Sequence, residues 1–185
     1  MSMQTQMPPA FIHSIEASAV GEWMRSNLLA MPWVNAAHVL CVTLVFGTVL
    51  VVDLRLLGLL DRGRAVTGIS REMLRLTWTA FAGAALSGLL FFSANATTYW
   101  FNTAFRFKML AIVLAGVNML VFQTVTFRSV ASWDRGSPPR AARVAGALSI
   151  LIWVSVIVLG RVIGFTKSVD VSVPENIDFD FSAGP

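Results

Sequence analysis

The sequence predicts an all-α integral membrane protein with four transmembrane helices in an antiparallel bundle, preceded by an amphipathic helix at the membrane interface. Of its 185 residues, 56% are hydrophobic and 13% are charged, and the mean hydropathy is +0.69. A soluble domain carries about 25% charged residues. Four apolar segments also reach the length of about 20 residues that a helix needs to cross a bilayer. Composition and segment length therefore agree that lipid is the solvent of this chain.

Residues 11–27 have the spacing of an amphipathic helix. Apolar residues recur at helical intervals from Phe11 to Trp23, whereas His13 falls elsewhere on the helical wheel. We expect this helix to lie flat on the membrane surface. Residues 1–10 are expected to be disordered. Because they contain no basic residue, we do not expect a cleaved signal peptide.

Residues 32–165 are predicted to form one domain of four spans. Pro32 and Trp33 mark its start, because proline suits the first turn of a helix and tryptophan favours the interface. Pro138 lies in the last connection, where it cannot continue a helix. The predicted spans run from about residue 32 to 60, 76 to 95, 107 to 127 and 143 to 165.

The arginines predict how the bundle is oriented. The connection over residues 55–75 contains five arginines and that over residues 128–143 contains four. The positive-inside rule places both in the cytoplasm, so in a bacterial inner membrane both termini face the periplasm. Residues 168–185 form an acidic extramembrane tail in this prediction. Since topology accounts for the net charge of +4, we do not expect a nucleic-acid partner.

Three cationic or titratable residues from three spans are predicted to share one depth near the periplasmic end. They are His38, Lys108 and Arg161. If they turn inward, they form a pocket suited to a propionate, carboxylate, phosphate or lipid headgroup. The alternative is that Lys108 and Arg161 extend to the outer headgroups while His38 hydrogen-bonds a neighbouring helix.

Other polar residues at membrane depth are Asp53, Arg55 and Asn118. Asp53 and Arg55 are assigned to a structural ion pair that locks the bundle. Because Arg55 points to a different face of its helix, the partner of Asp53 is expected from another helix, such as Arg75 or Arg128. The functional alternative is the mouth of a proton path. Asn118 is expected to bond a neighbouring helix or to contact the edge of a cofactor.

The motifs of soluble enzymes are missing from the sequence. Cys41 is the single cysteine, and no histidine-rich cluster, HExxH, Walker or GxGxxG pattern occurs. These absences argue against structural zinc, nucleotide hydrolysis and dinucleotide binding. We therefore expect a protein that is not an enzyme.

A family resemblance rests on one succession of motifs. The motifs are His38, Asp53-Leu54-Arg55-Leu56-Leu57-Gly58, Ser87-Gly88, Phe107-Lys108-Met109, Asn118 and Gly160-Arg161. In this order they resemble an uncharacterised family, a domain of unknown function, of small bacterial inner-membrane proteins. The resemblance implies four membrane helices behind an amphipathic helix, and no established reaction.

A looser similarity exists to four-helix cytochrome b and copper-resistance membrane proteins, which hold haem or metal with histidines. This chain offers only His13 and His38. Two histidines from two spans therefore cannot both ligate haem b within one protomer. His38 as an axial haem ligand would need a methionine, a water, a residue of another subunit, or His13 folded back over the bundle.

Three functions are carried forward. The first is a non-enzymatic membrane subunit that binds haem, a quinone or a lipid at the cationic pocket and supports electron transfer. The second is an accessory or scaffolding subunit of a larger membrane complex, or a homo-oligomer, which docks through its acidic tail and a small-residue helix face. The third is an ion or proton carrier that uses Asp53 and His38. The small residues of the second hypothesis are Gly83, Ala84, Ser87, Gly88 and Gly116.

Overall fold

The computed structural model describes residues 8–60, 65–134 and 136–166, and all regular structure in this part of the chain is helical. Four helices are long and apolar enough to cross a membrane, which confirms the predicted fold class. They are α3 (Ala30–Leu56), α4 (Val66–Ala94), α6 (Thr103–Val121, extended by a π-helical segment, Phe122–Thr126) and α7 (Arg140–Thr166). At 1.5 Å per residue, each helix matches or exceeds a hydrocarbon core of about 30 Å.

The start of α4 lies well before the predicted start of the second span. The helix begins at Val66, whereas the sequence predicts a start near residue 76. The prediction misses the first turns because they are polar and lie outside the apolar window. Asp134 holds this start: its carboxylate accepts hydrogen bonds from the Thr67 backbone N–H at 2.8 Å and from the Thr67 hydroxyl at 2.9 Å. Hydropathy therefore located the membrane-embedded part of α4 and missed its extension.

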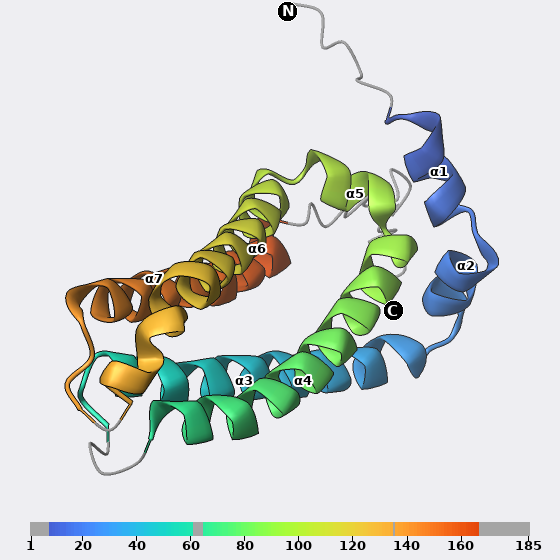
Figure 1. Cartoon of the computed structure of the whole chain (residues 1–185). Coiled ribbons are helices and arrows are strands. Elements are labelled where there is room, and N and C mark those ends of the chain that lie inside the picture. The colour runs from blue at the N-terminus through green and yellow to red at the C-terminus, as the bar shows by residue number, and fades with distance from the viewer. Residues whose placement is uncertain (1–7, 61–64, 135, 167–185) are drawn as a thin grey trace, which may run out of the picture.

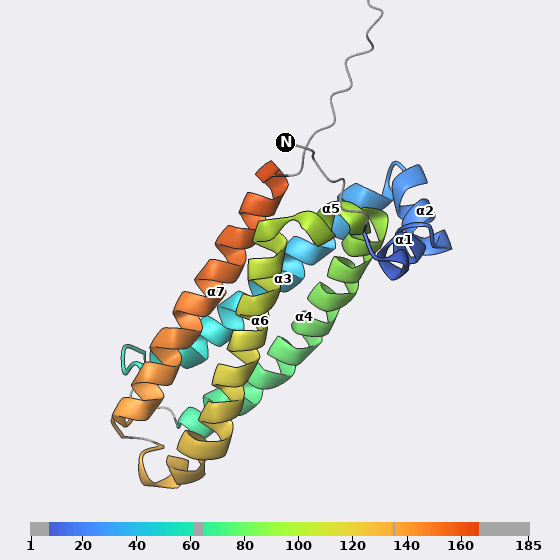
Figure 2. The same ribbon diagram turned by 90° about the horizontal axis from the view of Figure 1, so that it is seen from above.

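The four long helices form two pairs. Helix α3 packs along α4, α6 packs along α7, and contacts between α3 and α7 join the pairs. Helices α4 and α6 pack at most weakly against each other, and Figure 1 shows them diverging toward the end where α5 (Ala96–Phe101) connects them. Seen from above, the four helices run roughly side by side (Figure 2). The bundle is thus closed along α3 and α7 and less tightly packed between α4 and α6.

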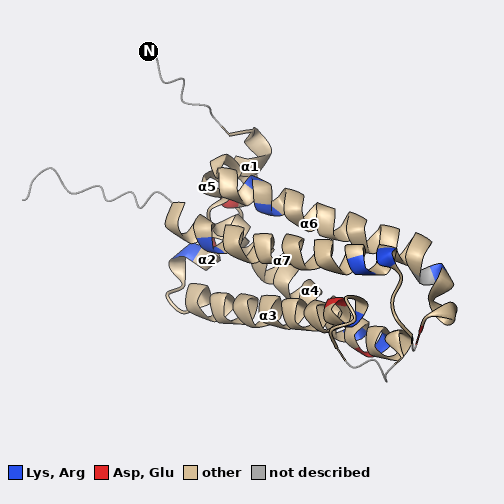
Figure 3. Cartoon of the chain, turned by 90° about the vertical axis from the view of Figure 1, so that its left-hand side faces the viewer, with Lys and Arg blue, Asp and Glu red and all other residues tan. Residues whose placement is uncertain are grey.

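The opposite end of the bundle is closed by a buried apolar cluster, which consists of Leu56, Val66, Trp133 and Ala142. Arg55 is 0% exposed beside it, and its Nη2 donates to the Asp134 carbonyl at 3.3 Å. Figure 3 shows the Lys, Arg, Asp and Glu positions gathered toward the two ends of the long helices, with tan helix between. This distribution is the one expected of a protein whose middle lies in hydrocarbon.

The predicted single amphipathic helix over residues 11–27 is divided in two. Helices α1 (Ala10–Glu16) and α2 (Ala19–Ser26) are separated by a turn, because Ser18 caps α2 by accepting a hydrogen bond from the Gly21 N–H at 3.2 Å. The expectation of one continuous helix was wrong in this respect, since the serine offers the backbone an alternative to continued helix.

Both short helices pack onto the α5 end of the bundle. Ile12 and Met24 are buried, and Arg25 Nη1 donates to the Ala94 carbonyl at the end of α4 at 3.0 Å. Residues 1–7 of the segment predicted to be disordered and the predicted acidic tail, residues 168–185, lie outside the described residues.

Candidate binding site among the four spans

His38 of α3 is held against α4 by a defined hydrogen bond. Its Nδ1 lies 2.8 Å from the Ser87 hydroxyl, and that hydroxyl lies 2.7 Å from the Gly83 carbonyl one turn earlier on α4. The imidazole also meets the Phe91 ring edge to face, with ring centroids 5.7 Å apart. A hydrogen bond and a perpendicular aromatic contact together fix the plane of the ring.

Two glycines of α4 make room for α3. A Cβ on Gly83 would lie 2.7 Å from Cys41 Sγ, and one on Gly88 would lie 3.5 Å from His38 Cε1. The small-residue face predicted for the second span is therefore the surface that packs on α3. It brings the backbone of α4 close enough for Ser87 to reach the imidazole. Gly83 and Gly88 are consequently partly covered by α3.

Lys108 of α6 approaches the same region from the other helix pair. Its side chain is half-buried and passes Gly160 of α7, where an added Cβ would lie 3.5 Å from Nζ. The ammonium is near enough to His38 to interact with it electrostatically. Among the described residues, Lys108 Nζ forms no hydrogen bond or ion pair. A partly buried charge at membrane depth thus has no counter-charge among the residues that the structure describes.

The polar site therefore draws one residue from each long helix, and we call it the His38–Lys108 site. It consists of His38, Ser87, Lys108 and Gly160. His38 lies eight residues after the start of α3 and Lys108 five after the start of α6, whereas Ser87 lies seven residues before the end of α4 and Gly160 six before the end of α7. All four positions are one to about two helical turns from the α5 end.

Arg161 does not join this site. It is exposed, and its Cζ lies 5.1 Å from the centroid of the Phe165 ring on the same helix. Successive residues of an α-helix are rotated by about 100°, so the Gly160 backbone facing Lys108 turns the Arg161 side chain elsewhere. Of the three residues predicted to share a pocket, the structure places His38 and Lys108 within electrostatic range of each other and leaves Arg161 outside.

Asn118 lies ten residues beyond Lys108 on α6 and has a partner there. Its Nδ2 donates to the Ala145 carbonyl of α7 at 3.0 Å. This contact is the interhelical bond that the sequence offered as one of two alternatives for Asn118. The position lies about three helical turns from Lys108, so Asn118 is not part of the His38–Lys108 site.

Asp53 and Arg55 have separate surroundings. Asp53 is 5% exposed and its carboxyl interacts with the Ser149 side chain of α7, while Arg55 donates to the Asp134 carbonyl. No hydrogen bond or ion pair joins Asp53 to Arg55 among the described residues. Asp53 Oδ2 has no hydrogen-bond partner in this part of the chain. The two residues thus tie α3 to different segments at the end remote from His38.

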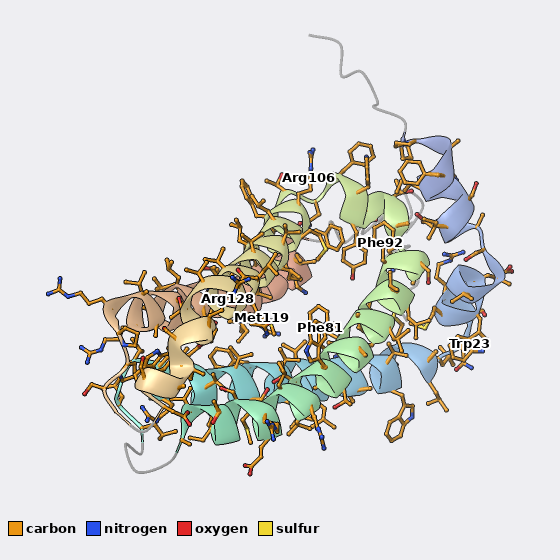
Figure 4. The ribbon with its side chains drawn as sticks, viewed as in Figure 1. Trp23, Phe81, Phe92, Arg106, Met119 and Arg128 are labelled. Carbon is orange, nitrogen blue, oxygen red and sulfur yellow. The ribbon has the colours of Figure 1, made fainter. Side chains whose placement is uncertain are left out.

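Aromatic rings border the site at the α5 end. Phe92 of α4 stacks on Phe105 of α6 with centroids 5.7 Å apart and planes 15° apart, and Tyr99 of α5 lies 5.3 Å from Phe105. Farther along, Phe81 and Met119 project from α4 and α6 toward the space between the helix pairs (Figure 4). The polar site is therefore flanked by aromatic and apolar side chains on both sides along the helix axes.

Sequence reasoning missed the roles of Ser87 and Gly160. In the sequence Ser87 stands out as a small residue and as part of the Ser87-Gly88 motif, although a serine one turn after a glycine on a helix that faces a histidine is also a hydrogen-bond partner. Gly160 stands out there only as the residue before Arg161. Their positions relative to His38 and Lys108 depend on helix rotation, which a pattern of apolar residues does not resolve.

These features define the class of the protein: it is a multi-pass membrane protein with four helices long and apolar enough to span the bilayer. The chain belongs to DUF6644, described as a family of unknown function, whose model matches residues 18–166. The match covers α2 through α7 and confirms the predicted membership of an uncharacterised family. No curated protein and no solved structure matches the chain significantly. The looser similarity to cytochrome b and copper-resistance proteins stays a prediction.

Proposed function

We propose that this protein is a non-enzymatic membrane subunit that binds a quinone at the His38–Lys108 site and supports electron transfer. The observation that carries the proposal is the Lys108 ammonium, which is half-buried, has no counter-charge among the described residues and lies within electrostatic range of an oriented imidazole. An ionised group at membrane depth costs roughly 2.5 to 3.5 kcal/mol on insertion scales, so a ligand that accepts its hydrogen bonds offsets that cost.

Quinone chemistry matches the groups that the site offers. A quinone carbonyl accepts a hydrogen bond from Lys108, and the ammonium stabilises the negative charge that develops on the oxygen when the ring is reduced. The aromatic side chains of Phe91, Phe92 and Phe105 offer flat apolar surfaces nearby. A headgroup held at this depth would leave its apolar tail in hydrocarbon.

The weak packing between α4 and α6 supports entry from the bilayer. The two helices pack at most weakly against each other along their length, and the stacked rings of Phe92 and Phe105 join them at the α5 end. A hydrophobic ligand confined to the membrane would reach Lys108 by moving sideways between the helix pairs, without crossing water. The arrangement therefore suits a lipid-soluble ligand better than a water-soluble one.

Haem b and an anionic lipid are the competing ligands. Haem b would obtain one axial ligand from His38, and the other histidine of the chain, His13, is exposed on α1. An anionic lipid would satisfy Lys108 through a phosphate oxygen and make no use of the oriented imidazole. A quinone that is reduced to its quinol offers an oxygen to Lys108 and a hydroxyl to the imidazole, and we favour a quinone for that reason.

The test compares the affinity for decylubiquinone, by calorimetry on protein purified in mild detergent, between the wild type and Lys108→Met. Loss of a charge-assisted hydrogen bond predicts a dissociation constant about 10-fold to 100-fold higher. Arg106→Met is the matched control, because Arg106 lies two residues away on α6 and points away from the bundle (Figure 4). The affinity of Arg106→Met for decylubiquinone should equal that of the wild type.

Three further results decide between the ligands. Saturable binding of dioleoylphosphatidylglycerol that Lys108→Met abolishes, with no binding of decylubiquinone, would replace the quinone by a lipid. A Soret band in haem-supplied protein that His38→Ala removes would replace it by haem. Equal quinone affinities of wild type and Lys108→Met would reject the site itself.

The cellular setting is part of the proposal. We place the protein in a bacterial inner membrane with its arginine-bearing end in the cytoplasm. The described arginines of that end are Arg55, Arg71, Arg75, Arg128, Arg140 and Arg143. The His38–Lys108 site then lies in the periplasmic half of the bilayer. A bound quinone would exchange electrons with redox subunits of a larger membrane complex, which is the partner we propose.

A further inference from the structure

The Ser87 hydroxyl has a single proton and two neighbours that compete for it. Its oxygen lies 2.7 Å from the Gly83 carbonyl and 2.8 Å from His38 Nδ1. A carbonyl oxygen can only accept, whereas a ring nitrogen of neutral histidine either donates or accepts. Both short contacts are hydrogen bonds in one arrangement: Ser87 donates to the Gly83 carbonyl, and His38 Nδ1–H donates to Ser87.

A second acceptor on the same side supports this assignment. The Ala84 carbonyl lies 3.2 Å from the Ser87 hydroxyl. The hydroxyl proton therefore has two backbone acceptors on its own helix, which leaves the hydroxyl oxygen to accept from Nδ1–H. In the neutral ring, Nε2 then carries a lone pair and no hydrogen.

We infer that Ser87 is a positioning residue that fixes the Nδ1–H tautomer of His38, and that the His38–Lys108 site consequently prefers a quinol to a quinone. This inference rests on the proposed function. A quinol hydroxyl donates to the His38 Nε2 lone pair while an oxygen of the same ligand accepts from Lys108. A quinone has two acceptor oxygens and no donor, so it leaves Nε2 without a partner.

The expected preference for the quinol over the quinone equals the net free energy of one hydrogen bond. A net contribution of this size corresponds to a dissociation constant about threefold to tenfold lower for decylubiquinol than for decylubiquinone. Binding transfers no electron in this scheme, so it requires no additional redox reagent. The preference concerns which form of the ligand is held, and Lys108 serves both forms.

Ser93 provides a matched control on the same helix. It is also a buried serine of α4, and its hydroxyl donates to the Leu90 carbonyl at 2.8 Å without contacting His38. Ser87→Ala and Ser93→Ala each remove one hydroxyl that bonds back to the helix. A general structural effect of losing a buried serine would therefore appear in both variants.

The first measurement needs no ligand. Nitrogen-15 NMR of histidine-labelled protein at a pH where the imidazole is neutral distinguishes a protonated Nδ1 from a protonated Nε2. We expect the Nδ1–H form of His38 in the wild type and in Ser93→Ala, and a mixture of tautomers in Ser87→Ala. Signals of His13 are assigned with the His13→Gln variant. An Nε2–H form in the wild type would overturn the inference, as would an unchanged Nδ1–H form in Ser87→Ala.

The second measurement compares decylubiquinol, kept reduced under anaerobic conditions, with decylubiquinone. We expect the quinol preference in the wild type and in Ser93→Ala, and its loss in Ser87→Ala. Equal affinities for both forms in the wild type would overturn the inference and leave quinone binding intact. Failure of both forms to bind a protein with an Nδ1–H His38 would reject the proposed function and the selectivity, while the tautomer assignment would stand.

Discussion

Gly83 of α4 lies directly against Cys41 of α3: a Cβ on the glycine would come within 2.7 Å of the cysteine Sγ. The contact sets the distance between the two helices that hold His38 and Ser87. Real Cβ atoms do not approach a neighbour so closely, so the pair of residues acts as a spacer of the α3–α4 interface.

Gly83→Ala should therefore destabilise the bundle. Overpacking of a close helix contact costs about 1 to 3 kcal/mol, measurable as a lower midpoint of thermal or denaturant unfolding in detergent. Gly47→Ala is the control, because a Cβ there meets nothing within 4 Å. Cys41→Ala should restore most of the lost stability to Gly83→Ala, and failure of this rescue would mean that another contact sets the interface.

Asn118→Ala should affect stability and spare ligand binding. Its hydrogen bond to the Ala145 carbonyl joins α6 to α7, and interhelical bonds of this kind are worth about 0.6 kcal/mol and at most about 1.7. We expect a small loss of stability and an unchanged affinity for decylubiquinone. A large loss of affinity with unchanged stability would indicate that the ligand binds near the middle of the bundle, which would contradict our placement of the site.

The packing of α1 against α5 should depend on pH through the carboxylate of Glu16. Its Oε2 accepts a hydrogen bond from the Thr97 N–H at 2.7 Å. Partial burial acts to raise the pKa of Glu16, but the hydrogen bonds from Thr97 together with the positive charges of Arg25 and His13 outweigh it and hold that pKa below the ordinary value of 4.5. A lowered folded-state pKa gives stability that is present above the ordinary value and is lost as pH falls through the folded value.

Hydrogen exchange of the α1 and α5 amides should accordingly rise as the pH falls below about 4.5, after correction for the intrinsic pH dependence of exchange. Glu16→Gln should remove this additional pH dependence, and Glu22→Gln, on the exposed side of α2, should retain it. An identical profile in the wild type and Glu16→Gln would show that another group controls the docking.

Cysteine labelling tests the orientation. In a Cys41→Ser background, Gly68→Cys at the arginine-bearing end should react with a membrane-impermeant maleimide only after the cells are lysed. Ser14→Cys, exposed on α1 at the other end, should react once the outer membrane alone is permeabilised. The reverse pattern would invert the topology and place the His38–Lys108 site in the cytoplasmic half of the bilayer.

The sequence predicted the number and type of the long helices, because each span is an apolar run of bilayer length. It did not predict that α4 begins at Val66, since the first turns of that helix are polar and depend on Asp134, which is distant in sequence. The break at Ser18 was missed for a local reason. A serine within an amphipathic pattern supports either a continued helix or a cap, and here it caps α2.

The sequence predicted the depth of the candidate site residues along the helices but not the direction in which their side chains point. His38, Lys108 and Arg161 were all expected near one end, and they lie there. Which of the three side chains turn inward depends on how each helix is rotated about its axis. A span that is almost uniformly apolar has no clear polar face, so its sequence carries little information about this rotation. Gly160 and Arg161 show this limit, since the glycine faces Lys108 and the adjacent arginine lies over Phe165.

Photoaffinity labelling with an azidoquinone tests most directly whether the ligand lies where we place it. Labelled peptides, mapped by mass spectrometry, should contain His38 or the residues around Lys108, and labelling should fall in Lys108→Met but not in Arg106→Met. The contrary result is labelling confined to the outward apolar groove of about 510 Å³ between α6 and α7, with Leu110 and Val158 among its lining residues, and insensitive to Lys108.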